Sequence, residues 1–463
     1  MKVAIDIDHT ILCYDDLLKE AANLENVEDP FSNKEELKKI IEEKYDWPQK
    51  WINIQGHLYG KLIHKAPLKN GAYDCLNELK EEITIELVSH KSLKSLCGRY
   101  ELQAEAVKRL TDLGVTELIK DIKFFETKRE KLDYLNKSSF NIVIDDLSEI
   151  INKTNILIPI LYSPLHSSPF IHTNDWTLIR ALLKSLKYIN VESVLKLKKI
   201  SKQTIKMNLN ENNKNIFLKY FIDEERSRRE RYIYHWQYPE FIMYENENVL
   251  ITKDLNLTPV EIIEKKDIHG LVKEIKRYRG IDLNLKAIDG ISHFEDLEAN
   301  LNRRLEYLNS NNKNLLKLDF IKKFILKNLN KSLGIKTENL LPDFFKGNMA
   351  RNSKNEIVFM DFESFGKDDP ARMFLNFCHH LGHKYTFDEI DILKEAFILA
   401  FNDEKLFDRV EKLYNYVAFD WLLILYKWNK EKFEEELNKM HKKIIIGDKI
   451  ISPQKEVYDH IFG

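Results

Sequence analysis

The chain begins with the segment Lys2-Val3-Ala4-Ile5-Asp6-Ile7-Asp8-His9-Thr10-Ile11-Leu12, in which a run of strand-forming residues leads into two carboxylates. Side chains alternate between the two faces of a strand, so Asp6 and Asp8 start on the same side, and the turn after the strand can aim both at one ligand. This arrangement suits phosphoryl transfer. One carboxylate can attack phosphorus and hold Mg²⁺, while the second donates a proton to the leaving oxygen.

Three further polar motifs follow in chain order, two of them directly after apolar runs. A predicted strand over 83–88 ends at Ser89, and a second predicted strand over 140–144 ends in Asp145 and Asp146. Between them, the segment 126–132 carries Lys128 and, three residues later, Lys131. Taken singly, the acidic residues are also explained as turn formers or as helix N-caps, which acidic residues after strands often are. The complete set in one α/β segment favours a shared site.

This set resembles the four motifs of the haloacid dehalogenase superfamily, and the resemblance implies a Rossmann-like domain with a helical cap. It implies that Asp6 is the nucleophile and Asp8 the proton donor, with Ser89 binding the phosphoryl group. The resemblance implies a lysine that neutralises charge, for which Lys128 is the predicted residue, with Lys131 close behind. The implied metal ligands are Asp6, Asp8, Asp145 and Asp146. Because Asp8 is acidic, the resemblance favours a phosphatase over a dehalogenase.

The segment between the first two motifs is predicted to be the cap, from about residue 13 to about residue 80. Helical patterns cover Tyr14 to Asn23 and Asn33 to Lys44. A cap at this place closes over an active site and selects the substrate. Four side chains of this segment either line the cleft or merely pack the cap, and both interpretations stay open: Trp47, Trp51, Tyr59 and His64.

From about residue 191 the sequence pattern changes to short strands followed by long helices rich in Leu, Lys, Glu and Asn. Two strands are predicted over 204–209 and 214–221, around a polar turn at 210–213. The second strand carries Lys219, and the helix predicted over 224–236 carries Glu230. A lysine on a strand and a glutamate on the following helix form the pair that orients nucleotide phosphates in kinase folds.

A second motif set lies between residues 340 and 363. Asp343 is followed five positions later by Asn348, and a predicted strand over 357–360 ends in Asp361-Phe362-Glu363. This segment is similar to the catalytic segment of the aminoglycoside phosphotransferase and choline kinase family. The resemblance implies that Asp343 accepts the proton of the substrate hydroxyl and that Asn348 and Asp361 hold Mg²⁺ on ATP. It departs from the pattern at Leu341, where the family usually has His.

Length and composition set the frame for both sets of motifs. At 463 residues the chain is long enough for two or three domains. We expect an α/β phosphatase domain over 1–190, fused to a two-lobed, protein-kinase-like α+β domain over 191–463. Its N-lobe is expected over about 191–260 and its C-lobe over about 261–463.

Charge and cysteine usage exclude some classes of partner. The 72 basic and 74 acidic side chains nearly balance, so no global field favours nucleic acid or an anionic membrane. Four scattered cysteines form no CxxC pair, and the apolar runs are shorter than the ~18 residues that span a bilayer. We expect a cytoplasmic protein with phosphorylated small molecules and nucleotide triphosphate as partners. The sequence does not fix the oligomeric state.

The leading hypothesis is a bifunctional, Mg²⁺-dependent enzyme. One half removes phosphate from a small molecule and the other phosphorylates a hydroxyl of a sugar or amino-alcohol intermediate, with surface polysaccharide building blocks as a plausible setting. The alternative is a phosphatase carrying a degenerate kinase domain that senses nucleotide or regulates. The loss of the usual His at Leu341 keeps that alternative open.

Overall fold

The computed structural model of the chain describes residues 1–163, 170–199, 203–209, 214–281, 285–306, 308, 314–329, 333–381 and 384–463. It divides into two compact units, each described by itself. The first is Met1–Ser227 with Glu240–Asp254, and the second is Arg228–Pro239 with Leu255–Gly463. The boundary predicted at residue 190 falls inside the first unit, and the division of activities between 1–190 and 191–463 stays a prediction. The polar turn predicted at 210–213 lies outside the described residues.

The first unit contains a six-stranded sheet of order β3-β2-β1-β4-β5-β6, in which every pairing is parallel. Its strands are β1 (Lys2–Ile5), β2 (Thr84–His90), β3 (Asp121–Phe125), β4 (Ile142–Asp145), β5 (Ile158–Leu161) and β6 (Ile171–His172). The central strands are continuous apolar runs because helices cover both faces of the sheet. The strand order reverses at β1. In open α/β sheets, ligands bind at the carboxyl end of the strands at such a reversal point.

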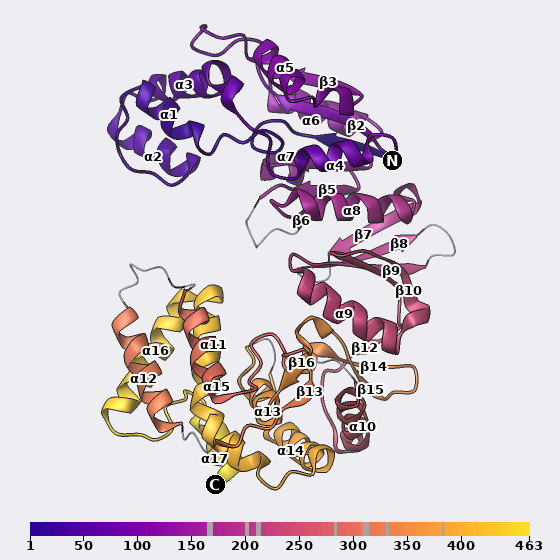
Figure 1. Cartoon of the computed structure of the whole chain (residues 1–463), viewed down its shortest axis with the longest axis vertical. Coiled ribbons are helices and arrows are strands. Elements are labelled where there is room, and N and C mark those ends of the chain that lie inside the picture. The colour runs from indigo at the N-terminus through magenta and orange to yellow at the C-terminus, as the bar shows by residue number, and fades with distance from the viewer. Residues whose placement is uncertain are drawn as a thin grey trace. The chain divides into compact units, whose positions relative to one another are not determined.

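Helices connect these strands, and a separate helical group follows β1 (Figure 1). The connecting helices are α4 (Ala72–Leu79), α5 (Leu102–Asp112), α6 (Lys128–Lys137), α7 (Ser148–Lys153) and α8 (Trp176–Tyr188). The separate group consists of α1 (Leu17–Leu24), α2 (Lys34–Lys44), α3 (Gln49–Gly56), the π-helix η1 (His57–Lys61) and the 3₁₀-helix η2 (Ile63–Lys65). This helical group occupies the segment predicted as the cap.

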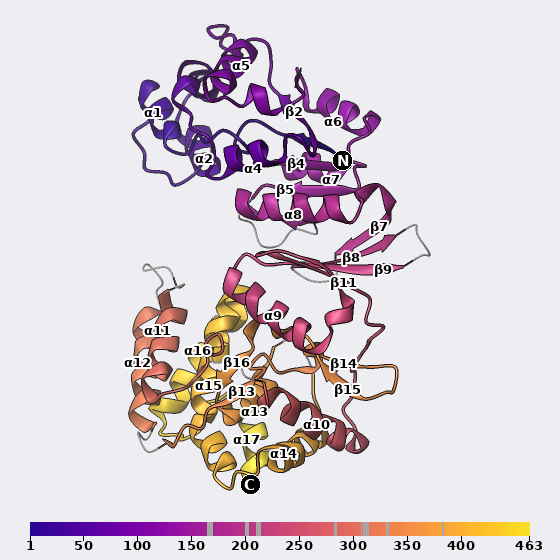
Figure 2. The same ribbon diagram turned by 45° about the vertical axis from the view of Figure 1, so that its right-hand side comes forward.

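An antiparallel sheet of order β10-β11-β9-β8-β7 completes the first unit. Its strands are β7 (Val194–Lys199), β8 (Thr204–Leu209), β9 (Asn215–Tyr220), β10 (Ile242–Glu245) and β11 (Val249–Lys253). Helix α8 lies between the two sheets (Figure 2), and apolar side chains of β8, β9 and β11 belong to the same buried cluster as those of α8. The Asn246 side chain donates hydrogen bonds to the Ala181 carbonyl and to Ser185 Oγ, both at 3.2 Å, and Tyr188 packs against Tyr244.

This packing predicts that a fragment ending at residue 190 is less stable than one ending at residue 254. Without the antiparallel sheet, the apolar side chains of α8 that share a buried cluster with β8, β9 and β11 lose part of their cover, and each large apolar side chain left exposed costs about 1.5–3 kcal/mol. We expect the 1–190 fragment to melt at the lower temperature, by about 2–4 °C for each kcal/mol lost. Thermal unfolding followed by circular dichroism checks this. Equal melting temperatures would show that α8 needs no cover from the sheet.

The second unit is mainly helical, with small sheets near its centre. After α9 (Glu224–Gln237), which spans the junction of the units, its helices are α10 (Ile268–Arg279), α11 (Phe294–Glu306), α12 (Leu315–Asn328), α13 (Pro370–His379), α14 (Phe387–Phe401), α15 (Leu406–Trp428), α16 (Lys430–Ile445) and α17 (Lys455–Phe462). One sheet pairs β12 (Thr258–Pro259), β14 (Met349–Arg351) and β15 (Ile357–Phe359), and another pairs β13 (Glu338–Leu340) with β16 (Gly366–Asp368). A single apolar cluster fills the unit.

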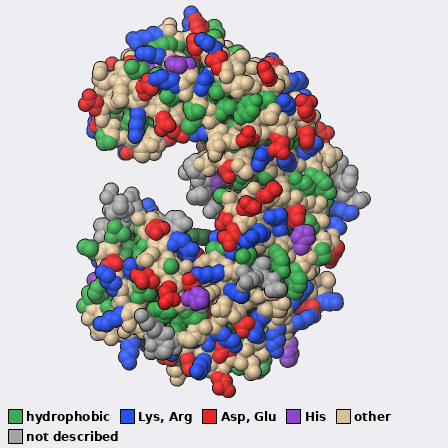
Figure 3. Space-filling model, viewed as in Figure 1, with side chains coloured by type: hydrophobic (Ala, Val, Ile, Leu, Met, Phe, Trp, Pro, Cys, Tyr) green, Lys and Arg blue, Asp and Glu red, His purple; other side chains and the backbone are tan. Residues whose placement is uncertain are grey.

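The predicted α/β character is confirmed by the parallel sheet and its helices. Basic and acidic side chains are interspersed on the face shown in Figure 3, in keeping with the formal net charge of −2. Within the described part of the chain, the helices are too short or too polar to cross a membrane.

Candidate active site

Three carboxylates converge at the carboxyl ends of two adjacent strands of the parallel sheet. Asp6 directly follows β1, Asp145 ends β4 and Asp146 comes next. One oxygen of each can be chosen so that the three atoms lie within 4.8 Å of one another. The pairing of β1 with β4 explains this, because parallel strands deliver their last residues to the same edge of the sheet. These three residues, named here the acidic cluster, are three of the four metal ligands that the sequence predicts in this unit, and the fourth, Asp8, is not part of the cluster.

A buried lysine holds two members of the acidic cluster. The Lys131 ammonium lies 2.5 Å from Asp6 Oδ1 and 2.7 Å from Asp145 Oδ2, and its side chain is 1% exposed. Burial acts to lower the pKa of Lys131, but the two carboxylates raise it above its ordinary value, so the ammonium stays charged. Lys131 therefore neutralises part of the negative charge at the centre of the site.

The structure corrects our choice of Lys128 for this position. Lys128 is the first residue of α6, and its ammonium lies on the surface, 3.0 Å from Glu149 Oε2. A capping box between Thr127 and Glu130 fixes where the helix starts, and Lys131, three residues after Lys128, comes to face the sheet. The sequence shows both lysines, but it does not show which side of the helix packs inward.

Replacing each lysine in turn tests whether Lys131 or Lys128 neutralises charge at the site. Lys131→Met leaves Asp6 and Asp145 buried without their cation, so we expect loss of about 3 kcal/mol of stability or more together with loss of the activity proposed below for this site. Lys128→Met removes only a surface ion pair and should leave both unchanged. Urea unfolding in the presence of a chelator measures the first effect without a metal contribution. An unfolding midpoint of Lys131→Met equal to that of Lys128→Met would contradict this account.

Asp8 is bound by two partners that sequence reasoning missed. The Lys91 ammonium lies 3.0 Å from Asp8 Oδ1 and 2.9 Å from Asp8 Oδ2, and the Tyr14 hydroxyl donates a hydrogen bond of 2.6 Å to Oδ1. Burial acts to raise the pKa of Asp8, but Lys91 and Tyr14 outweigh it, so the pKa lies below its ordinary value. The position of Lys91, just after β2, was the available signal, because Ser89 on that strand was already singled out.

The electrostatics of the acidic cluster suit a divalent cation. Burial and the neighbouring carboxylates raise the pKa of Asp6 well above its ordinary value, although Lys131 opposes them. Burial and Asp145 raise the pKa of Asp146 to about 7. Carboxylate oxygens are the ligands that Mg²⁺ prefers, and its charge would offset the repulsion among the three groups. The residues present therefore fit the implied Mg²⁺.

Ser89 and Thr10 complete the buried polar groups at this edge of the sheet. Ser89 is buried near the carboxyl end of β2, next to β1 in the sheet, as its predicted role requires. The Thr10 side chain is fully buried, and its carbonyl accepts a hydrogen bond of 3.0 Å from Trp176 Nε1. His9, between Asp8 and Thr10, has a φ of 62°, in the left-handed region that tight turns use.

One of the four aromatic cap candidates lies at the site. The Tyr59 hydroxyl lies 2.9 Å from His9 Nε2 and accepts a hydrogen bond of 2.9 Å from the Lys34 ammonium, and the Lys91 ammonium lies 4.9 Å from the Tyr59 ring centre. Burial raises the pKa of Tyr59 to about 12 and lowers that of His9 to about 4, so both are neutral at neutral pH.

The other three candidates pack or face solvent. Trp51 belongs to the buried core, and Trp47 is exposed beside Lys38. The His64 ring is exposed and bonds the Lys61 carbonyl. For these three side chains, the interpretation as structural or surface residues holds.

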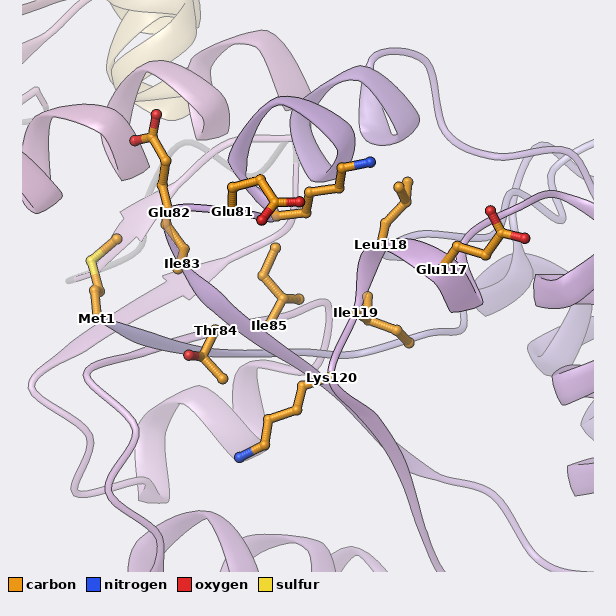
Figure 4. A pocket seen from close by; sticks show the side chains of 11 residues that line it. Met1, Glu81, Glu82, Ile83, Thr84, Ile85, Glu117, Leu118, Ile119 and Lys120 are labelled. Carbon is orange, nitrogen blue, oxygen red and sulfur yellow. The ribbon is translucent and has the colours of Figure 1, made fainter.

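A hollow of about 350 Å³ lies at the opposite edge of the same sheet (Figure 4). Met1 and Thr84 mark the amino ends of β1 and β2 there, and Glu117 and Lys120 also line the hollow. Because it lies at the amino ends of the strands, it is remote from the acidic cluster. It adds nothing to the chemistry of the site.

The second unit brings Asp343 and Asn348 together as predicted. Asn348, in the 3₁₀-helix η9 (Lys346–Asn348), is buried, and its amide donates to the Asp343 carbonyl at 2.8 Å and to Asp343 Oδ2 at 3.3 Å. The Asn348 carbonyl accepts from the Met360 amide at 2.9 Å, which ties this loop to the segment before Asp361. Asp361 has a φ of 63°, an unusual backbone conformation of the kind that clusters at functional sites.

A histidine from another part of the second unit lies near Asp343, although Leu341 stands where the family usually has His. Leu341 is buried in the apolar core, whereas His380, directly after α13, places Nε2 at 3.5 Å from Asp343 Oδ1. The His380 ring stacks on Phe345 with centres 3.6 Å apart and packs edge-on against Trp421. A histidine thus lies beside Asp343 from a different element. The sequence carried no signal for it, because His380 is 37 positions from Asp343.

Lys219 and Glu230 fall in different compact units. Lys219 lies on β9 as predicted, with its ammonium 5.3 Å from the Phe221 ring centre, and Glu230 is buried in α9. Since each unit is described by itself, their pairing stays a prediction.

Comparisons with known proteins give low similarities. No family model and no curated protein matches the sequence. Among solved structures, the choline kinase LicA from Streptococcus pneumoniae matches with a TM-score of 0.41 and 12% identity, over 57% of this chain and 98% of that one. An ethanolamine kinase from Plasmodium vivax matches with a TM-score of 0.40 and 14% identity, over 51% and 77%.

A third match is of another class. The HAD-hydrolase YfnB from Bacillus subtilis, a structure bound to magnesium, matches with a TM-score of 0.29 and 18% identity, over 41% of this chain and 98% of that one. All three TM-scores lie below 0.5, so these similarities decide no activity for this chain.

Proposed function

We propose that the first unit is a Mg²⁺-dependent phosphatase that acts on small phosphate monoesters. The observation that carries this proposal is the arrangement of Asp6, Asp145 and Asp146 within 4.8 Å at the carboxyl edge of the sheet, with Lys131 buried among them. The reaction needs a carboxylate that attacks phosphorus, a metal site, and a second carboxylate that transfers the proton. Asp6 can be the first, the acidic cluster the metal site, and Asp8 the second carboxylate.

The chemistry divides into two displacements at phosphorus. Asp6 attacks the phosphoryl group, the bond from phosphorus to the ester oxygen breaks, and the leaving alkoxide takes a proton from Asp8 and becomes an alcohol. Asp8 must therefore hold this proton in the substrate complex, although Lys91 and Tyr14 favour its carboxylate form in the free site. In the second step, Asp8 accepts a proton from water as the water attacks phosphorus, and the bond to Asp6 breaks. Ser89 binds a phosphoryl oxygen. Mg²⁺ held by Asp6, Asp145 and Asp146 would neutralise charge on the phosphoryl oxygens, and the role of Asp8 as a metal ligand stays a prediction.

For the second unit, the proposal is an ATP-dependent kinase acting on a hydroxyl of a sugar or amino alcohol. The contact of Asn348 with Asp343 and the backbone bond from Met360 to Asn348 support it, because they place the proposed base and the proposed Mg²⁺ ligands, Asn348 and Asp361, on connected segments. His380 beside Asp343 supports an active centre despite Leu341. The roles predicted for Lys219 and Glu230, on the nucleotide phosphates, stay predictions.

Together these proposals describe a bifunctional enzyme of small-molecule metabolism. A phosphatase and a kinase on one chain would waste nucleotide if both acted on one position, so the two act at different positions or on successive intermediates. The alternative, a phosphatase with a regulatory kinase-like domain, rests on the replacement of the usual His by Leu341.

Two assays on the full-length protein test these proposals. Phosphate release from a panel of phosphorylated metabolites, with Mg²⁺ and with a chelator, tests the first. Release that needs the metal is expected, and no release from any ester would contradict it. Calorimetry with Mg-ATP, followed by transfer assays on choline, ethanolamine and free sugars, tests the second. Binding without transfer to any acceptor would favour the regulatory alternative.

A further inference from the structure

Lys34, the first residue of α2 in the helical group after β1, brings a positive charge to the phosphatase site. Its ammonium donates a hydrogen bond to the Tyr59 hydroxyl at 2.9 Å, and the Tyr59 hydroxyl also contacts His9, next to Asp8. Burial acts to lower the pKa of Lys34, but Tyr59, Asp146 and Asp8 outweigh it and raise the pKa, so the side chain is an ammonium at neutral pH. Lys34 therefore lies within the electrostatic field of the site.

This ammonium is paired differently from the other lysines around it. Lys131 forms ion pairs with Asp6 and Asp145, and Lys91 forms an ion pair with Asp8. Among the described residues, no carboxylate lies within 4.0 Å of Lys34 Nζ, and its hydrogen-bond partner is a neutral phenol. A partly buried ammonium without a counter-ion is costly, and an anion that arrives with the substrate would satisfy it.

The in-line geometry of the displacement determines which part of the substrate lies near Lys34. In a displacement at phosphorus, the leaving oxygen lies roughly in line with and opposite to the attacking atom. The attacking atom belongs to Asp6 at the end of β1, while the proton donor to the leaving oxygen, Asp8, is held by Tyr14 and Lys91 on the side of Tyr59. The leaving alcohol therefore faces Tyr59 and Lys34, and the phosphoryl oxygens face Lys131 and Ser89.

We propose that Lys34 determines specificity for phosphate monoesters whose leaving alcohol carries a second anionic group, a carboxylate or another phosphate. This inference rests on the proposed phosphatase function and names its substrate class. The side chain is a specificity residue that contacts the alcohol part of the substrate, and it takes no part in breaking the ester bond.

The test compares matched esters with the full-length protein. 3-Phosphoglycerate and glycerol 3-phosphate differ mainly in a carboxylate against a neutral hydroxymethyl group, and fructose 1,6-bisphosphate and fructose 6-phosphate differ in a phosphate. Lys34→Gln should lower kcat/KM for the more anionic member of a pair about tenfold to hundredfold, and for the neutral member less than about twofold, which is the range expected when one charge-assisted hydrogen bond is lost. The pair that responds shows which anion is recognised.

Two controls accompany this comparison. Lys39→Gln removes an exposed lysine of the same helix that pairs with Glu43. It should leave the ratio of the two kcat/KM values within each pair of esters unchanged. Lys34→Arg keeps the charge and should keep most of the preference. An equal loss for both members of each pair would place Lys34 on the phosphoryl group and overturn the inference.

The wild-type protein gives an answer that needs no variant. If it hydrolyses a generic aryl phosphate but shows no preference within either pair, the inference fails while the proposed function stands. If it hydrolyses no ester at all, the proposed function fails and the inference fails with it.

Discussion

Asp6→Asn should abolish the phosphatase activity of the full-length protein, with turnover falling by about three to six orders of magnitude because the attacking atom is removed. The amide has the same shape as the carboxylate, so the buried site keeps its packing. Loss of the negative charge also removes one ligand from the acidic cluster and one partner from Lys131. Phosphate release from a generic ester, measured at saturating Mg²⁺, gives the effect.

A matched control separates chemistry from folding in this experiment. Asp121 lies at the other end of a strand of the same sheet, where its exposed carboxylate pairs with Lys123. Asp121→Asn should keep the wild-type rate. Near wild-type hydrolysis by Asp6→Asn would show that another group attacks phosphorus.

In the second unit, two substitutions should affect nucleotide binding and phosphate transfer differently. Asp361→Ala should weaken binding of Mg-ATP by about tenfold or more, because a metal ligand is lost. Asp343→Asn should bind Mg-ATP almost normally and transfer phosphate at about one thousandth of the wild-type rate or less, because the base is lost. Calorimetry and a transfer assay on the full-length protein measure the two effects independently.

The surface residue Asp319, paired with Lys323 on α12, provides the control for both substitutions. Asp319→Ala should change neither binding nor transfer. Binding of Mg-ATP that is unaffected by Asp361→Ala would place the nucleotide elsewhere, and no binding by the wild-type protein would remove the kinase proposal.

The sequence predicted the acidic cluster because its members are set by strand geometry. Asp6, Asp145 and Asp146 each follow an apolar run, and parallel pairing of neighbouring strands brings such positions to one edge. Asp343 and Asn348 were accessible for a similar reason, since only five positions separate them and a local turn brings them into contact.

Positions on helices and in the cap were harder to predict. The choice between Lys128 and Lys131 depends on which side of α6 packs on the sheet, and six charged residues within ten give that helix no clear apolar face. Lys34 and His380 reach their sites from elements far away in sequence, which only the tertiary packing brings near. Among the cap aromatics, composition alone could not separate Tyr59, at the site, from Trp51, in the core.

The extent of the first unit could not be predicted from the sequence either. The strands predicted over 204–209 and 214–221 are present as β8 and β9, but the packing of their sheet with α8 was not predicted, because the sequence does not show which element covers the apolar side chains of α8.

The central claim is that Asp6 carries the phosphoryl group between the two displacements, and trapping that intermediate tests it most directly. The full-length protein is mixed with substrate and Mg²⁺, quenched in acid during turnover and digested, and the peptide containing Asp6 is examined by mass spectrometry. The account predicts that this peptide gains the mass of one phosphoryl group, that the gain is located on Asp6, and that it disappears in Asp6→Asn. Steady phosphate release with an unmodified Asp6 peptide, or with the phosphoryl group on another residue, would contradict it.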